Sequence, residues 1–203
     1  LAATNGTCTV LVRANQHQQA QNPQIFPASV LLVERFQPPL VELLRQEQLR
    51  FSQGTDMSAM IAALAYEPDQ PVDELVGEAV RRFRENGLNV GGCLHHLVPT
   101  GRTGCSDMFV EDIATGQLTS ISQALGKGAT GCRVDQAALA NIAVALESLV
   151  GQGLDLLVLN RFGKVEAEGG GLRSVIELAV GDGIPVLLAV QVQHLGALQS
   201  YAN

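Results

Sequence analysis

The chain has 203 residues, 46% of them hydrophobic, and its 13 Lys and Arg against 20 Asp and Glu give a formal net charge of −7. This length and apolar content suffice for one large globular domain, or for one domain with an appendage. The acidic balance excludes a generic nucleic-acid binder, because neutralising phosphates requires a clustered basic face and the sequence has none.

The apolar runs and the cysteines predict a cytoplasmic protein without a membrane span. The longest runs, such as residues 154–159 and 184–190, are far shorter than the roughly 20 residues that cross a bilayer. Residues 1–21 are polar and glutamine-rich, unlike a secretory signal. The four cysteines contain no CxxC pair, which is typical of reduced thiols: Cys8, Cys93, Cys105 and Cys132.

The composition divides the chain near residue 57. Residues 1–56 hold four basic side chains, four acidic side chains and nine glutamines, so residues 57–203 carry the whole net charge. We interpret residues 1–56 as an upstream extension with little fold of its own, although leucines at helical spacing predict an amphipathic helix over residues 39–50. A docking arm is the alternative. Residues 57–203 are expected to form a complete domain.

Strands and helices alternate in the first half of this domain. The pattern predicts a strand over residues 60–66, a helix over 72–83, a second strand over 88–94 and a loop over 95–104. Two short strands follow, around residues 108–113 and 118–122, with a turn between them. We expect these two strands to form a hairpin beside the main sheet.

The second half continues the alternation. A glycine-punctuated loop over residues 125–133 leads to a helix for which Asp135 is a natural N-cap. Residues 154–159 give the strongest signal of a buried strand, because they are almost continuously apolar. A long loop, a helix over 172–180 and a buried strand over 184–190 complete the pattern.

This alternation predicts an α/β fold with three layers, in which helices cover both faces of a mostly parallel sheet. Ligands in such folds bind beyond the carboxyl ends of the strands. Those ends are expected near Tyr66, Leu94, Asn160 and Val190.

The loop after the first strand lacks a phosphate-binding motif. A P-loop has the pattern GxxxxGK[ST], whose backbone N–H groups cradle phosphates. Residues 65–74 instead have the sequence AYEPDQPVDE, with four carboxylates and two prolines at the start of a helix. We interpret these carboxylates as helix capping, since acidic side chains complement the helix dipole and repel a triphosphate.

Two polar loops are candidate binding sites, and the first follows the strand over residues 154–159. Basic side chains and a triple glycine that leads into a helix suit an anion. The candidate ligand-binding residues are Asn160, Arg161, Lys164 and Arg173, and the candidate catalytic residue is Glu166. A flexible turn, in which Glu166 and Glu168 oppose the positive charge, is the alternative.

The second candidate is the loop over residues 121–135, where hydroxyl, guanidinium and backbone donors surround three glycines before a helix. Its candidate ligand-binding residues are Ser122, Gln123, Lys127, Cys132 and Arg133. A tight loop whose glycines supply positive φ angles is the alternative.

A metal site is not expected. Zinc requires four ligands in paired spacing, which a CxHH stretch followed by lone cysteines does not provide. Buried cysteines and surface histidines are the default interpretation of Cys93, His95, His96, Cys105 and Cys132. The sequence has no GxSxG or Cys/His protease signature, so nucleophilic catalysis has no support.

Three separated motifs resemble, in order, those of an uncharacterised bacterial family. They are ISQALG at residues 121–126, GCRVD at 131–135 and NRFGKVEAEG at 160–169. The family is a domain of unknown function whose members often lie beside molybdenum-uptake genes and are sometimes labelled molybdenum transporter ATP-binding proteins. The resemblance covers residues 57 to about 193.

The layout also resembles, more distantly, RecA-like P-loop nucleoside-triphosphatases. In those proteins a glycine-rich loop follows the first strand, and an Asp-Glu pair ends the strand that here ends in Asn160-Arg161. This chain departs at both points. The resemblance therefore implies a P-loop-like scaffold with degenerate Walker motifs, in which Glu166 matches a later acidic position.

Together these features predict a non-hydrolysing ligand-binding or regulatory accessory protein in molybdenum homeostasis. It would bind an oxyanion or a nucleotide at the strand C-terminal loops, with molybdate, or a nucleotide with Mg²⁺, as the ligand. One alternative is a nucleoside-triphosphatase or phosphotransferase with Glu166 as base and Lys164 or Arg133 as charge clamp. Another is a protein-interaction scaffold. A homodimer or a protein partner is compatible with the sequence.

Overall fold

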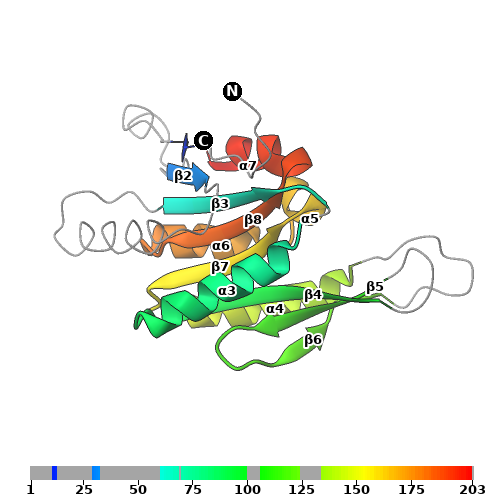
Figure 1. Ribbon diagram of the computed structural model, residues 1–203, viewed down its shortest axis with the longest axis horizontal. Helices are drawn as coiled ribbons and strands as arrows, with labels where there is room; N and C mark the ends of the chain where they lie inside the picture. The colour runs from blue at the N-terminus through cyan, green and yellow to red at the C-terminus, as the bar shows by residue number, and fades with distance from the viewer. Residues whose placement is uncertain are drawn as a thin grey trace, which may run out of the picture.

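The computed structural model describes residues 11–12, 29–32, 60–68, 70–99, 106–123 and 134–202, the first two ranges through their backbone. The strands in these ranges form one eight-stranded sheet in the order β1-β2-β3-β8-β7-β4-β5-β6 (Figure 1). They are β1 (Leu11–Val12), β2 (Ser29–Leu32), β3 (Met60–Tyr66), β4 (Val90–Pro99), β5 (Ser106–Asp112), β6 (Leu118–Ser120), β7 (Leu156–Phe162) and β8 (Val186–Gln191).

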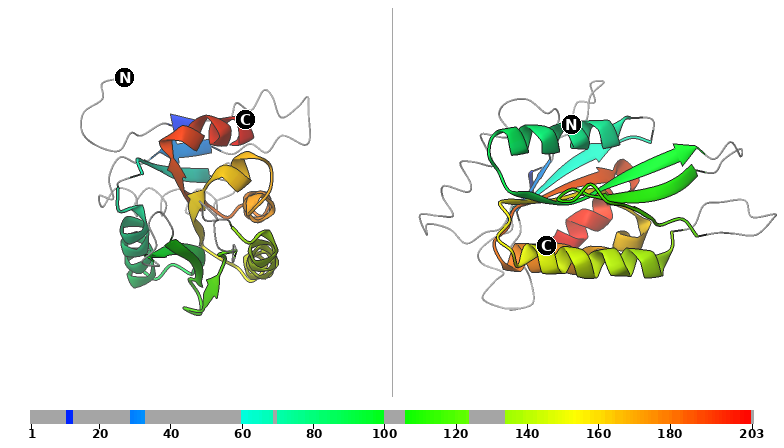
Figure 2. Two further views of the ribbon diagram at one scale, coloured as in Figure 1. Left: turned by 90° about the vertical axis from the view of Figure 1, so that its right-hand side faces the viewer. Right: turned by 90° about the horizontal axis from the view of Figure 1, so that it is seen from below.

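Helices cover both faces of the sheet (Figure 2). On one face lies α3 (Val72–Glu85), and on the other lie α4 (Gln136–Val150) and α6 (Arg173–Gly181). Three short segments complete the described helices: α5 (Lys164–Ala167), the 3-10 turn η1 (Val192–His194) and α7 (Leu195–Ala202). None of the described helices combines the length and apolarity that crossing a bilayer requires.

Four parallel strands, β3, β8, β7 and β4, form the middle of the sheet in that order. Although β8 is the last of the described strands along the chain, it lies between β3 and β7. The predicted three-layer, mostly parallel, P-loop-like fold is confirmed. The predicted hairpin is confirmed too, because β5 and β6 extend the sheet beyond β4 in antiparallel register.

The core lies on both sides of the central strands because alternate residues face opposite layers. In β3, odd-numbered residues from 61 to 65 belong to the buried cluster that includes residues of α4 and α6, and even-numbered residues from 62 to 66 belong to the cluster that includes residues of α3. Residues 156–160 of β7 are all buried, as expected for a parallel strand that is covered on both faces. Asp135 caps α4 as predicted, because its side chain accepts from the N–H groups of Ala137 and Ala138.

The structure corrects three expectations. The strand β4 continues through residues 95–99, which were expected to form a loop, because Cys93–Pro99 pairs with Ser106–Asp112 of β5. The strand β7 runs past Asn160 to Phe162, and α5 interrupts the expected long loop. The helix α7 follows β8 where no helix was expected.

Two short strands before residue 57 belong to the same sheet. The strand β2 pairs in parallel with β3, and β1 pairs with β2. The division of the chain at residue 57 stays a prediction, and the expected helix over residues 39–50 lies outside the described residues.

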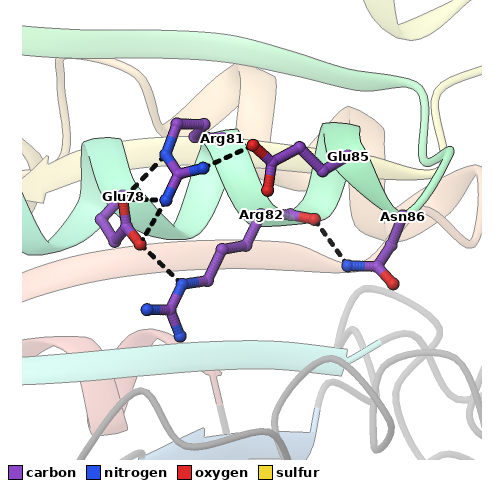
Figure 3. Close-up of polar contacts among 5 residues, drawn as sticks. All are labelled: Glu78, Arg81, Arg82, Glu85 and Asn86. Carbon is purple, nitrogen blue, oxygen red and sulfur yellow. Dashed lines mark hydrogen bonds and ion pairs between the residues drawn. The ribbon is translucent and has the colours of Figure 1, made fainter.

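A chain of ion pairs covers the outer surface of α3 (Figure 3). Arg81 pairs with Glu78 and with Glu85, and Arg82 pairs with Glu78 at 2.7 Å. These four side chains are between 37% and 57% exposed, so solvent screens the pairs and each one adds little to the stability of the helix. The cations of this surface are already paired.

Gly92 of β4 lets two strands of the sheet approach closely. Its φ is 122°, and a Cβ atom there would lie 2.0 Å from the carbonyl oxygen of Val158 in β7. Any side chain would therefore push β4 away from the strand that carries Asn160.

We expect Gly92→Ala to lower the free energy of unfolding by about 3–5 kcal/mol, because it combines backbone strain with a backbone clash. Chemical denaturation measures the change. The control is Gly77→Ala in α3, where nothing lies within 4 Å of the added Cβ, and this variant should gain up to about 1 kcal/mol. Equal stability of the two variants would contradict the prediction.

Candidate functional site

A cluster of polar side chains lies at the carboxyl ends of the central strands. Its members come from four elements: Tyr66 ends β3, Asp73 lies in the first turn of α3, His95 lies on β4, and Asn160 and Arg161 lie near the end of β7. This edge is where ligands bind in open parallel sheets.

A bulge in β7 turns two successive side chains toward α3. Leu159 pairs with Leu188, but the next pair joins Phe162 to Val190, so three residues of β7 span two of β8. The extra residue breaks the strict alternation of faces. Asn160 and Arg161 therefore both contact Asp73, while Phe162 returns to the core on the α4 and α6 side.

Asn160 is fully buried, and its amide pairs with the backbone of β4. Its Oδ1 accepts from the N–H of His95 at 2.6 Å, and its Nδ2 donates to Asp73 Oδ1 at 2.9 Å and to the His95 carbonyl at 3.4 Å. The contact with Asp73 requires a donor. An aspartate at position 160 would put a second carboxylate against Asp73, and like charges at this distance repel.

Arg161 forms the charged half of the network. Its Nη2 donates to Asp73 Oδ2 at 2.7 Å, and its Nη1 donates to the Tyr66 hydroxyl at 3.4 Å. Its Nε is buried and has no partner among the described residues. Burial raises the pKa of Tyr66, and Arg161 opposes this shift, so the phenol stays neutral.

His95 supplies a second buried polar atom without a described partner, its Nε2. Burial lowers the pKa of His95 to about 3, with Arg161 and His96 adding to the shift. The imidazole is therefore neutral at physiological pH. The neighbouring His96 instead pairs with Glu111 across the strands at 2.7 Å.

Glu166 holds the loop that follows β7. Its Oε2 accepts from the N–H of Gly163 at 2.9 Å, and its Oε1 accepts from the N–H of Leu172 at 3.1 Å. Only 6% of the residue is exposed. Gly171 packs so closely that a Cβ there would lie 2.0 Å from Oε1. A role as catalytic base stays a prediction, and the geometry gives this carboxylate a structural task.

The other two basic candidates of this loop have local partners. Lys164 is 78% exposed and pairs with Glu168 at 3.6 Å. Arg173 stacks on the ring of Tyr201, 4.1 Å from its centroid, and its Nε lies 4.0 Å from Glu177. Their partners therefore lie directly after α5 and in α6 and α7, and none of them is Asp73.

The second predicted loop is only partly described. The Ser122 hydroxyl accepts from the N–H of Met108 at 2.5 Å, and Gln123 is exposed. Ser122 therefore belongs to the edge beside β5, which β4 separates from β7. Three further candidates lie outside the described residues: Lys127, Cys132 and Arg133.

The described residues contain no group of three His, Cys, Asp or Glu side chains that could hold a metal ion. Cys93 is buried, and this burial raises the pKa of its thiol to about 12. Cys105 and Cys132 lie outside the described part of the chain.

Sequence reasoning missed the role of Asp73. We interpreted its carboxylate as a helix cap. That interpretation is wrong, because both of its oxygens accept hydrogen bonds from side chains of β7 and not from the backbone of α3. The sequence did contain a signal for this contact. An acidic residue stands at the start of a predicted helix, and an Asn-Arg pair stands at the end of a predicted strand.

The chain belongs to a family described as "Protein of unknown function (DUF2478)", which matches residues 61–203. It is also 40% identical over 131 residues to a protein of Bradyrhizobium diazoefficiens named "Molybdenum import ATP-binding protein ModC 2". That match covers 64% of this chain and 14% of the relative, so the chain spans about one seventh of the relative's length. No solved structure matches the chain significantly.

We expect Glu166→Gln to lower the free energy of unfolding by about 1–3 kcal/mol, because one backbone N–H would face an amide donor in place of a carboxylate oxygen. Chemical denaturation tests this. The control is Glu168→Gln, which removes the same charge from a side chain that is 66% exposed and should change stability by about 0.5 kcal/mol or less. If both variants are equally stable, Glu166 does not hold the loop.

His95 should make the folded state less stable in acid. Its pKa falls from 6.5 in the unfolded chain to about 3 in the folded protein, so the unfolded state binds the extra proton between these values. The free energy of unfolding should therefore fall as the pH drops below about 6.5, by up to about 1.4 kcal/mol per pH unit from this group. Denaturation at several pH values should give a shallower slope for His95→Gln. Identical slopes would contradict the assignment.

Proposed function

We propose that this member of the family is a non-hydrolysing ligand-binding domain, which holds a tetrahedral oxyanion or the phosphate of a nucleotide beside Arg161. The observation that carries the proposal is a pair of buried polar atoms, Arg161 Nε and His95 Nε2, without partners among the described residues. They lie at the edge of the sheet where ligands bind in this class of fold.

An unsatisfied buried donor is costly, which supports a missing ligand. Leaving such a group without a partner costs about 1–3 kcal/mol, and native proteins keep few of them. A guanidinium binds oxyanions through two parallel N–H bonds, so Arg161 is suited to a phosphate or a similar anion.

Three features support the absence of hydrolysis in this proposal. The turn after β3 contains Pro68 and Pro71, which lack N–H groups for phosphates. The strand β7 offers Asn160 where a magnesium-binding carboxylate would be needed, and its amide is already bonded. Both oxygens of Glu166 accept backbone N–H groups.

The name of the Bradyrhizobium relative guides the choice of ligands. That protein is named for molybdenum import and ATP binding, and the shared segment is a small part of it. We therefore propose molybdate and nucleotides as the first ligands to test, and a regulatory accessory role in molybdenum homeostasis. The proposal places the domain in the cytoplasm, in keeping with cysteines that form no CxxC pair.

We expect calorimetric titration with molybdate, tungstate, ATP and GTP to detect binding by at least one of them, without ATP turnover in the presence of Mg²⁺. The variant Arg161→Gln should lose affinity at least tenfold, about 1.4 kcal/mol, because the oxyanion loses its cationic partner. The control Arg82→Gln removes the same charge from the outer surface of α3 and should bind as the wild type does. Absence of binding by all four ligands, or equal affinities of the two variants, would overturn the proposal.

A further inference from the structure

We propose that Asp73 is an internal competitor for Arg161, and that an anionic ligand binds by displacing the Asp73 carboxylate. This inference rests on the proposed function and adds to it how the site is kept closed without ligand. Its basis is the way in which Asp73 divides its two oxygens between Arg161 and Asn160.

The present ion pair uses only part of the guanidinium. The Nε–H and one Nη2–H of an arginine point to the same side and form a fork that accepts two oxygens of one anion. Asp73 places a single oxygen on the guanidinium, at 2.7 Å from Nη2, because its other oxygen accepts from Asn160 at 2.9 Å. Nε is left buried without a described partner.

A tetrahedral oxyanion satisfies more donors at this place than the carboxylate does. Two of its oxygens accept from Nε and Nη2 of Arg161, and a third is available to the Nδ2 of Asn160, which Asp73 would release. The ligand class is therefore a tetrahedral oxyanion, either a free ion such as molybdate or the phosphate of a nucleotide.

The position of Asp73 suits exchange with an external anion. It lies in the first turn of α3, where the helix dipole favours negative charge. The Asp73 and Arg161 side chains are 29% and 22% exposed, so solvent reaches the pair. In a P-loop scaffold the phosphate occupies the start of the helix after the first strand, and here a carboxylate of the chain takes this place.

Asp73→Asn is the deciding variant, titrated with inorganic phosphate, molybdate, ATP and uncharged adenosine. It should bind at least one of the three anions tenfold or more tighter than the wild type, because the competing charge is gone. Glu74→Gln is the matched control, since it removes the same charge from an exposed neighbour in the same helical turn; its affinity should change less than about twofold. Adenosine should not respond to either variant.

The outcomes separate this inference from the proposed function. If the wild type binds an anion and Asp73→Asn binds it no tighter than Glu74→Gln does, Asp73 does not compete and the inference fails alone. If no anion binds to the wild type or to either variant, both proposals fail. Adding Arg161→Gln to Asp73→Asn should abolish the gain. Asp73→Ser, checked by thermal melting, serves if the Asn variant does not fold.

Discussion

The carboxylate of Asp73 joins α3 to the end of β7, and this contact fixes the chemistry of the whole edge. A partly buried carboxylate is stabilised by hydrogen-bond donors and a compensating charge. Asn160 supplies the donor, and Arg161 supplies both a donor and the charge. The acidic start of α3 and the Asn-Arg end of β7 are therefore two halves of one interaction. The hydrogen bond to Asp73 therefore depends on the amide of Asn160, because an aspartate there would have no donor for it.

The backbone around this contact is built to hold it. Gly92 brings β4 close to β7, and the amide of Asn160 continues the pairing of these strands by bonding both backbone groups of His95. The bulge after Leu159 then turns Arg161 to the same side. Beyond β7, Glu166 fixes the following loop through Gly163 and Leu172. Gly92 and the hydrogen-bonded amide of Asn160 thus help to position the guanidinium of Arg161, whose Nε has no described hydrogen-bond partner.

Local signals were enough to predict most of the fold. The continuous apolar run of β7, the helical spacing of α3 and the capping side chain of Asp135 each depend on neighbours in sequence, and each appears in the structure. The extension of β4 to Pro99 was missed, because it depends on pairing with β5 and leaves Leu97 and Val98 exposed. The sequence predicted only part of the candidate site. Asn160 and Arg161 were named from a strand end, but their partner Asp73 lies 87 residues earlier than Asn160, and only the fold brings them together.

The net charge of −7 does not oppose an anion site of this kind. At physiological ionic strength, exposed charges farther apart than about 8 Å are largely screened, so most of the acidic residues act weakly at the end of β7. The charges that matter are within contact distance, and there Asp73 cancels Arg161. In our proposal, affinity for an anion depends on whether the ligand outcompetes a single carboxylate, and the unpartnered Nε of Arg161 favours the ligand. A nucleic acid is a long polyanion whose binding needs many cations, while in our proposal a single partly satisfied arginine binds a small oxyanion.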